Sequence, residues 1–123
     1  MAKILIVDDT AFMRRLLEQI LQAAGYEVAC AVDGQECLDM VGAEKPDLVI
    51  MDWNMPRMDG LEATRALRAD PVTRSLPVLV ASASSQDVDI AEMKAAGANG
   101  HVSKPFQAEQ LLTAVRQYLS VKT

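Results

Sequence analysis

The sequence predicts an α/β protein in which a five-stranded parallel sheet is covered by helices on both faces. Short apolar runs alternate five times with longer stretches whose apolar residues recur at three- and four-residue spacing, which is typical of strands joined by crossover helices. Parallel strands require right-handed crossovers, so this alternation gives a doubly wound (βα)5 architecture. A length of 123 residues and a hydrophobic content of 50% are expected to give one domain over residues 1–123.

The predicted strands are short apolar runs bounded by turn residues. The third run is apolar at every position from Leu48 to Met51 instead of alternating, so both of its faces are expected to be covered. Pro46 precedes this run and Pro77 precedes the next, which places loops before both strands. The predicted strands cover residues 3–7, 27–31, 47–51, 78–81 and 100–103.

The stretches between these runs predict amphipathic helices. Apolar residues that recur every three or four positions define the side expected to pack on the sheet, and Gly25 and Gly97 are placed to end two of the helices. The predicted helices cover residues 11–24, 35–41, 61–68, 88–96 and 108–119. The expected buried residues are Phe12, Leu16, Ile20 and Ala24 in the first helix, Cys37, Leu38 and Val41 in the second, and Leu111, Leu112, Val115 and Leu119 in the last.

Charge and composition exclude several classes of partner. Twelve basic and seventeen acidic residues give a formal charge of -5, which repels nucleic-acid backbones and anionic lipid surfaces. No apolar stretch approaches the roughly 20 residues that span a bilayer, so we expect a cytoplasmic protein without a membrane or direct nucleic-acid partner. Cys30 and Cys37 have no second Cys or His pair beside them to complete a zinc site, and we expect two reduced thiols.

Polar residues gather where the predicted strands end. The first strand is followed by Asp8 and Asp9, the third by Asp52, the fourth by Ser82, and the fifth by Lys104. Ligands of open α/β sheets bind beyond the carboxyl ends of the strands, so these side chains are expected to converge.

This set of side chains predicts a magnesium and phosphoryl site. Three carboxylates at one edge repel each other, and a hard divalent cation such as Mg²⁺ removes that repulsion. A lysine ammonium and a serine hydroxyl suit the oxygens of a phosphoryl group. Asp52 lies on the central strand, where cation and lysine neutralise a transferring group, and is therefore the expected nucleophile.

With these residues in place, the chain resembles the receiver domains of two-component response regulators over essentially its whole length. The motifs that carry the resemblance occur in the family's order and are "ILIVDD", "PDLVIMDWNMPRMDG", "PVLVASAS" and "GANGHVSKPF". Asp52 and Ser82 are thirty positions apart, and Ser82 and Lys104 are twenty-two apart, as in the family. The resemblance implies a CheY-like, flavodoxin-like sheet with strand order 2-1-3-4-5.

The resemblance also implies roles for individual residues around the phosphoacceptor Asp52. It implies that Asp9 is a direct Mg²⁺ ligand, that Asp8 binds the ion through water, and that the Asn54 backbone carbonyl is a further ligand. By the same pattern, Asn54 and Ser84 lie beside the route of the attacking water and tune the lifetime of the phosphoryl group.

Further implied roles concern the switch. The resemblance assigns Lys104 to the phosphoryl oxygens and implies a cis peptide bond between Lys104 and Pro105, a form that costs little only before proline. Ser82 and His101 occupy the positions whose coupled motion reports phosphorylation, and His101 departs from the family's usual tyrosine or phenylalanine. The output face is expected on the fourth helix, fifth strand and fifth helix.

The resemblance implies a signalling domain that catalyses its own phosphorylation and dephosphorylation, and not an enzyme with a separate substrate. A sensor histidine kinase or histidine phosphotransfer protein would donate the phosphoryl group, and a target protein would bind the output face. We expect a monomer or weak dimer. The chain is expected to be a stand-alone chemotaxis-type or relay regulator, with a fragment of a longer regulator as the alternative.

Three other functions remain as alternatives. A haloacid-dehalogenase-type phosphohydrolase would need an acid two positions after its nucleophile, where this chain has Asn54. A flavodoxin-like nucleotide binder would need a phosphate loop, where this chain has Asp8, Asp9 and Thr10. A degenerate interaction domain would lack part of the phosphoacceptor set.

Individual residues also have structural alternatives. Asp8 or Asp9 would suit the N-terminus of the first helix, although Thr10 can cap it instead. His101 would bring pH sensitivity to a switch position, because imidazole changes charge near neutral pH, or would simply face a partner. We favour a place on the output surface.

Overall fold

The computed structural model describes residues 2–53, 60–82, 87–104 and 106–119. Over these ranges the chain forms a five-stranded parallel sheet in the order β2-β1-β3-β4-β5, which confirms the predicted fold class. The strands are β1 (Lys3–Val7), β2 (Glu27–Ala31), β3 (Leu48–Asp52), β4 (Val78–Ser82) and β5 (Gly100–Ser103). The helices are α1 (Ala11–Ala23), α2 (Gly34–Glu44), α3 (Gly60–Ala69), α4 (Asp87–Ala96) and α5 (Ala108–Leu119).

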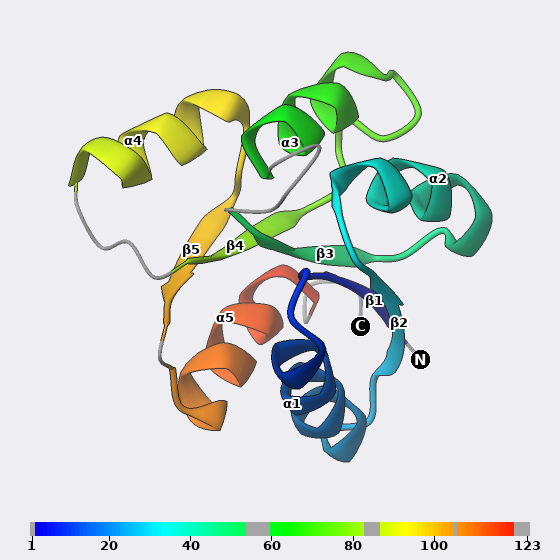
Figure 1. Ribbon diagram of the computed structural model, residues 1–123, viewed down its shortest axis with the longest axis vertical. Coiled ribbons are helices and arrows are strands. Elements are labelled where there is room, and N and C mark those ends of the chain that lie inside the picture. Colours follow the sequence, from blue (N-terminus) through cyan, green and yellow to red (C-terminus); the bar gives the residue numbers. More distant parts are fainter. Residues whose placement is uncertain (1, 54–59, 83–86, 105, 120–123) are drawn as a thin grey trace.

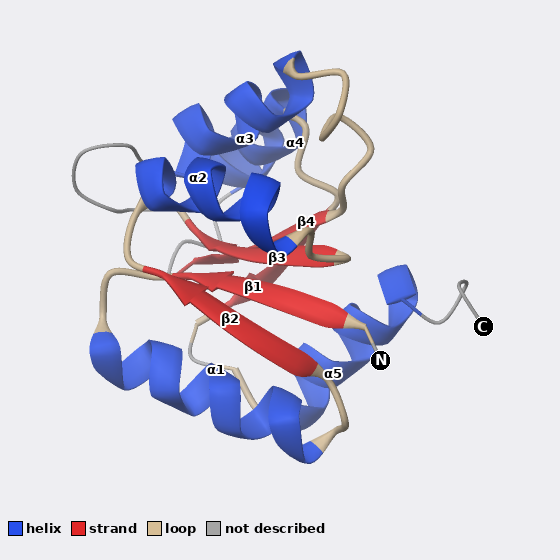
Figure 2. Ribbon diagram, turned by 90° about the vertical axis from the view of Figure 1, so that its right-hand side faces the viewer, coloured by secondary structure: helices blue, strands red, loops and turns tan. Residues whose placement is uncertain are grey.

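The helices form one layer on each side of the sheet. Figure 1 shows α1 and α5 on one face and α2, α3 and α4 on the other, and the view in Figure 2 separates the three layers. Side chains alternate along each strand, so Ile4 and Ile6 pack toward α1 and α5 while Leu5 and Val7 pack toward the opposite layer. Every residue of β3 is buried, as predicted for a strand covered on both faces.

The buried face of α1 differs from the predicted one. Leu17 and Leu21 are buried, whereas Phe12 is 71% exposed and Ala24 is exposed. The other two predicted residues, Leu16 and Ile20, are partly buried, and Ile20 packs against the core. Residues 13, 17 and 21 form a second set with four-residue spacing, and spacing alone does not choose between two such stripes. The start of the helix is joined to the end of β1, since the Asp8 carboxylate accepts a hydrogen bond from the Thr10 N–H (2.9 Å).

Arg68 ties α3 to the far ends of β4 and α4. Its guanidinium donates hydrogen bonds to the Gly97 carbonyl (2.9 Å), the Leu76 carbonyl (2.8 Å) and the Asn99 side-chain oxygen (2.8 Å). Partial burial lowers the pKa of Arg68. One side chain therefore fixes the C-terminal end of α4 against the neighbouring elements.

None of the helices within the described ranges has the length and apolar character that a membrane crossing requires. Both cysteines are free, Cys30 partly exposed on β2 and Cys37 buried on α2, as the sequence predicts. Met93 is also buried in the core between the sheet and the helices.

Burial of the Cys37 thiol predicts that the free energy of unfolding falls at alkaline pH. Burial raises the pKa of Cys37 from an ordinary value of 9.0 to about 12, so the folded thiol keeps its proton while the unfolded thiol loses it. Between these two values the unfolded state binds fewer protons, and the free energy of unfolding falls as pH rises, by at most about 1.4 kcal/mol per pH unit from this group.

Urea unfolding of the wild type and of a Cys37→Ala variant, followed between pH 8 and 11, measures this contribution. The variant is expected to be less stable at pH 8, because it leaves a cavity, but to lose less stability as pH rises. Burial also raises the pKa of the more exposed Cys30, so Cys30→Ala serves as the matched control with a smaller effect. Equal slopes in the wild type and Cys37→Ala would contradict the prediction.

Candidate functional site

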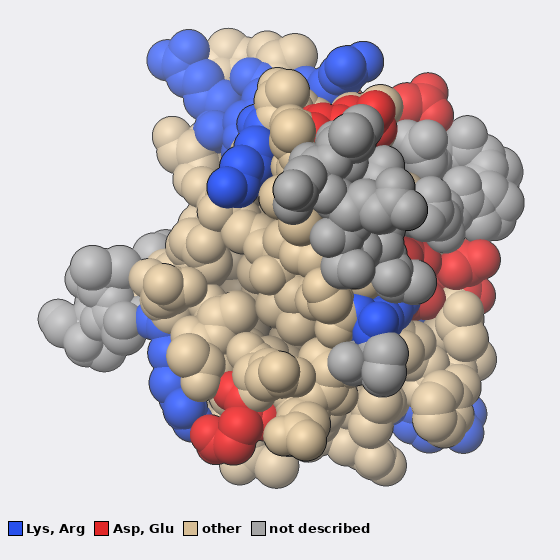
Figure 3. Space-filling model, turned by 90° about the vertical axis from the view of Figure 1, so that its left-hand side faces the viewer, with Lys and Arg blue, Asp and Glu red and all other residues tan. Residues whose placement is uncertain are grey.

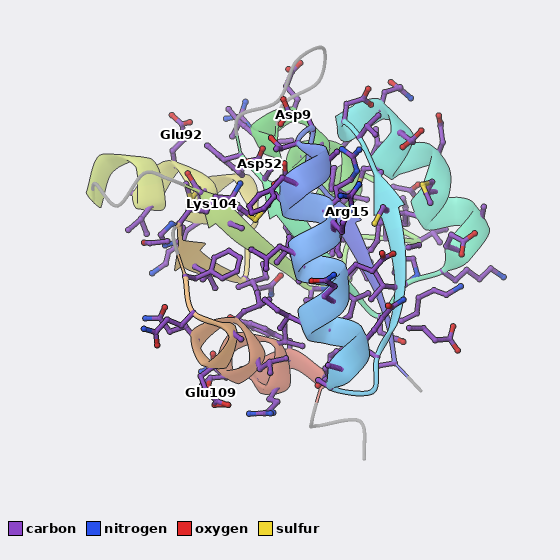
Figure 4. All side chains as sticks on the ribbon, turned by 60° about the horizontal axis from the view of Figure 1, so that its bottom comes forward. Asp9, Arg15, Asp52, Glu92, Lys104 and Glu109 are labelled. Atoms are coloured by element: carbon purple, nitrogen blue, oxygen red, sulfur yellow. The ribbon has the colours of Figure 1, made fainter. Side chains whose placement is uncertain are left out.

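The C-terminal ends of four strands bring the predicted site residues together. Asp8 follows β1, Asp52 ends β3, Ser82 ends β4 and Lys104 follows β5. Figure 4 shows Asp9, Asp52 and Lys104 at the same end of the sheet, whereas Glu109 on α5 lies away from them. The parallel sheet therefore assembles the site from segments that are far apart in the sequence.

Three carboxylates form an acidic cluster at this edge. Asp8, Asp9 and Asp52 each offer an oxygen atom, and these atoms lie within 4.8 Å of one another. Asp8 and Asp52 are buried, with 1% and 8% of their surfaces exposed, while Asp9 is exposed. An all-oxygen cluster that combines buried acids with one acid open to solvent fits a hydrated hard cation such as Mg²⁺.

The ammonium of Lys104 lies among these acids. Its Nζ atom is 3.0 Å from Asp8 Oδ2 and 3.4 Å from Asp52 Oδ1. The pairing with Asp8 goes beyond the role that the resemblance assigned to Lys104, and it follows from the need to compensate buried charge. The amide of Lys104 also donates a hydrogen bond to the Ser82 carbonyl (2.7 Å), which holds the start of this segment against β4.

Asp8 is fixed by contacts to four different groups. Its amide donates to the Ala31 carbonyl (3.1 Å) and its carbonyl accepts from Arg14 Nη1 (2.7 Å). Of its carboxylate oxygens, Oδ1 accepts from the Thr10 N–H (2.9 Å) and Oδ2 contacts Lys104. Thr10 occupies the N-cap position of α1, as the sequence allows, but within the described residues it makes no side-chain capping bond to the helix. Its own amide is bound by Asp8.

No role for Arg14 was predicted from the sequence, because the pattern of the first helix was defined by its apolar residues. Its signal was a basic residue on the second turn of the first helix, six positions after Asp8, where a long side chain reaches back to the preceding strand end.

A backbone hydrogen bond joins Trp53, which follows β3, to Gly60 at the start of α3. The Gly60 amide donates to the Trp53 carbonyl (3.0 Å), which brings the start of α3 back to the end of β3. Trp53 is 7% exposed and belongs to the core between the sheet and α2, α3 and α4. Asn54, predicted to offer a carbonyl ligand, lies outside the described residues.

Ser82 and His101 lie on adjacent strands, at different depths. Ser82 is 1% exposed at the end of β4, while His101 on β5 is partly exposed. His101 lines a groove of about 430 Å³ between β5 and α5, together with Gln110, Thr113 and other uncharged residues. Ser84 and the Lys104–Pro105 peptide bond, both assigned roles by the resemblance, fall outside the part of the chain that the structure describes.

The arrangement has the parts needed to receive a phosphoryl group. A carboxylate at the end of a central strand can act as the nucleophile, and the neighbouring acids can hold a cation that offsets negative charge. An ammonium at the same carboxylate supplies a second positive charge for phosphoryl oxygens.

Comparison with known proteins agrees with this chemistry. Residues 4–116 match the model of the response regulator receiver domain. The chain is 44% identical to the chemotaxis protein CheY of Pseudomonas aeruginosa over 110 residues, which is 89% of each chain. It is 36% identical over 121 residues to sporulation initiation phosphotransferase F of Bacillus subtilis, covering 98% of this chain and 96% of the relative.

Solved structures extend the likeness to three dimensions. The chemotaxis protein CheY4 of Vibrio cholerae superimposes with a TM-score of 0.92 at 39% identity, covering 97% of this chain and 99% of the other. The receiver domain of a sensor histidine kinase from Pseudomonas aeruginosa, described with a magnesium ion coordinated in its active-site cleft, gives a TM-score of 0.90 at 28% identity over 97% of this chain and 98% of the other. The strand-end acids, the five-stranded sheet and these relatives together show that the chain belongs to the receiver domain family of two-component response regulators.

Proposed function

We propose that Asp52 is the phosphoacceptor of this receiver domain and that its phosphorylation requires Mg²⁺. The observation that carries the proposal is the position of the Asp52 carboxylate, which lies beside two further acids and 3.4 Å from the Lys104 ammonium. A carboxylate oxygen of Asp52 attacks the phosphorus atom of a phosphohistidine or acyl phosphate. The bond from phosphorus to the donor breaks, its electron pair leaves with the donor, and an aspartyl phosphate remains.

The acidic cluster would hold the metal through Asp9 directly, Asp8 through water, Asp52, and the carbonyl of Asn54. The engagement of both Asp8 carboxylate oxygens, by the Thr10 amide and by Lys104, supports an indirect role for Asp8. Bound Mg²⁺ supplies positive charge against the phosphoryl oxygens. Lys104 contributes a second positive charge, and Ser82 a hydroxyl donor.

Phosphorylation replaces the carboxylate charge of Asp52 with a phosphoryl group that carries about -1.5 to -2 of charge and three acceptor oxygens, which favours movement of Ser82 and Lys104 toward it. The coupled response of His101 would then alter the face formed by α4, β5 and α5. The three hydrogen bonds of Arg68 anchor the C-terminal end of α4, so any shift is expected at its other end. Asn54 and Ser84 would set the lifetime of the phosphoryl group.

The same face is our proposed docking surface for a downstream target. Figure 3 views the side that carries α4, β5 and α5 and shows a broad area of uncharged residues with charged groups at its edges. The groove beside His101 is lined by Gln, Thr, Ser, Ala and Val residues, which favours recognition through hydrogen bonds and small apolar contacts.

The phosphodonor would be a sensor histidine kinase or a histidine phosphotransfer protein. We further propose that residues 1–123 form a single domain that acts in the cytoplasm as a monomer or weak dimer and catalyses its own phosphorylation and dephosphorylation. Nucleic acid and membrane surfaces have no proposed role, in keeping with the formal charge of -5.

Fluorescence of Trp53, the only tryptophan in the sequence, tests this function because the residue adjoins Asp52. Titration with Mg²⁺ is expected to change the emission, and beryllofluoride is expected to change it again. An Asp52→Asn variant removes the nucleophile, so it should lose the second change. The same response in both proteins would contradict the assignment of Asp52, and no response to Mg²⁺ in either would contradict the metal site.

A further inference from the structure

Arg14 contacts the backbone of the acidic cluster instead of its carboxylates. Its Nη1 atom donates a hydrogen bond to the Asp8 carbonyl at 2.7 Å, a short distance typical of charge-assisted hydrogen bonds. Arg14 is partly buried on α1, and the helical bond from its own amide to the Thr10 carbonyl (3.0 Å) fixes its starting point.

The Asp8 carbonyl is a critical atom because of peptide geometry. The peptide unit is planar, so the carbonyl oxygen of Asp8 and the amide nitrogen of Asp9 lie in one plane and turn together. The Asp8 amide is already held by the Ala31 carbonyl of β2. A hydrogen bond to the Asp8 carbonyl therefore fixes the backbone from which both adjacent carboxylates project.

We propose that Arg14 is a positioning residue for Mg²⁺ binding, which it supports by holding the peptide between Asp8 and Asp9. This inference rests on the proposed function of the acidic cluster as the metal site. Residues that orient metal ligands without touching the metal typically contribute about 10- to 100-fold to affinity or activity.

The charge of Arg14 and its hydrogen bond to Asp8 are expected to have opposite effects on Mg²⁺ binding. A cation held at the backbone of Asp8 opposes the binding of a second cation at the acidic cluster, so removing only its charge should tighten Mg²⁺ binding. Removing its hydrogen bond should weaken binding, because the two acids lose their fixed backbone. The direction of the change therefore separates the two roles.

The experiment is a Mg²⁺ titration of the full chain followed by Trp53 fluorescence and by calorimetry. Arg14→Ala is expected to weaken Mg²⁺ binding about tenfold. Arg14→Lys keeps a donor on a long side chain and should recover most of the affinity. Arg15→Ala is the matched control, because it removes the same charge from the next, exposed position and should not weaken binding.

Phosphorylation by acetyl phosphate gives a second readout. The Arg14→Ala variant should need about tenfold more Mg²⁺ for half-maximal rate but reach nearly the wild-type rate at saturation. Circular dichroism and urea unfolding establish that each variant is folded. If Arg14→Ala does not fold, Arg14→Gln is measured in its place.

Unchanged or tighter Mg²⁺ binding by Arg14→Ala would overturn the inference. The inference would also fail if Arg14→Lys lost as much Mg²⁺ affinity as Arg14→Ala. A wild-type protein that binds no Mg²⁺ would instead contradict the proposed metal site itself. The two failures are therefore distinguishable.

Discussion

Replacing Lys104 with alanine is expected to tighten Mg²⁺ binding on the order of tenfold, a change of about 1.4 kcal/mol, and to slow phosphorylation of Asp52 by about 10²- to 10³-fold. The Lys104 ammonium contacts both Asp8 and Asp52, so it competes with a metal ion for the same carboxylates. Its loss removes that competition and also removes a positive charge placed for the phosphoryl oxygens. Metal titrations by Trp53 fluorescence and rates with acetyl phosphate measure the two effects separately.

Lys94→Ala is the matched control for this experiment. Lys94 is an exposed lysine near the end of α4, and its removal changes the net charge by the same amount. Lys94→Ala should change neither the Mg²⁺ affinity nor the phosphorylation rate by more than about twofold, since exposed charges are screened by salt. Weaker Mg²⁺ binding in Lys104→Ala would show that the lysine supports the metal site instead of competing with it.

Replacing Gly60 with alanine is expected to lower the free energy of unfolding by about 1 to 3 kcal/mol and to slow phosphorylation of Asp52 by about 10²-fold. An alanine Cβ would lie 2.6 Å from the Asp52 backbone oxygen and 2.9 Å from both Trp53 Cα and Trp53 Cε3. Two of these three atoms are backbone, so relief requires the end of β3 and the start of α3 to separate. The Asp52 carboxylate then leaves its position beside the other acids.

Gly42→Ala provides the comparison for this variant. Gly42 lies within α2, and no described atom would come within 4 Å of an added Cβ. Alanine is favoured over glycine inside a helix by about 0.5 to 1 kcal/mol, so this variant should be slightly more stable and equally active. Urea unfolding and acetyl phosphate assays compare the two variants, and wild-type stability and rate in Gly60→Ala would contradict the close packing at this turn.

The order and type of the elements could be predicted from the sequence because each strand is a short apolar run and each helix has its own periodicity. The rotation of α1 could not, since the set containing Phe12 and Leu16 and the set containing Leu17 and Leu21 have the same spacing. In the structure the buried side is centred on Leu17 and Leu21, with Ile20 of the predicted set packed at its edge. The predicted bounds of β1, β2, β5 and α5 are confirmed. Ends of the other elements differ from prediction by one to three residues, the most in α2, which runs from Gly34 to Glu44.

Within the site, the convergence of Asp8, Asp9, Asp52 and Lys104 was predictable because parallel strands present their carboxyl ends at one edge. The individual contacts between these side chains were not predictable from the sequence. The pairing of Lys104 with Asp8 depends on side-chain reach across the sheet, and a basic residue six positions after Asp8 does not by itself show that its side chain binds a backbone carbonyl. The roles assigned to Asn54, Ser84 and the Lys104–Pro105 bond stay predictions.

The most direct test of the account is the intact mass of the protein after treatment with acetyl phosphate. With Mg²⁺ present, the wild type is expected to gain the mass of one phosphoryl group. The gain should disappear when the metal is chelated and should be absent in Asp52→Asn under all conditions. A phosphoryl adduct of equal yield on Asp52→Asn, or one that forms equally well without metal, would contradict the central claim.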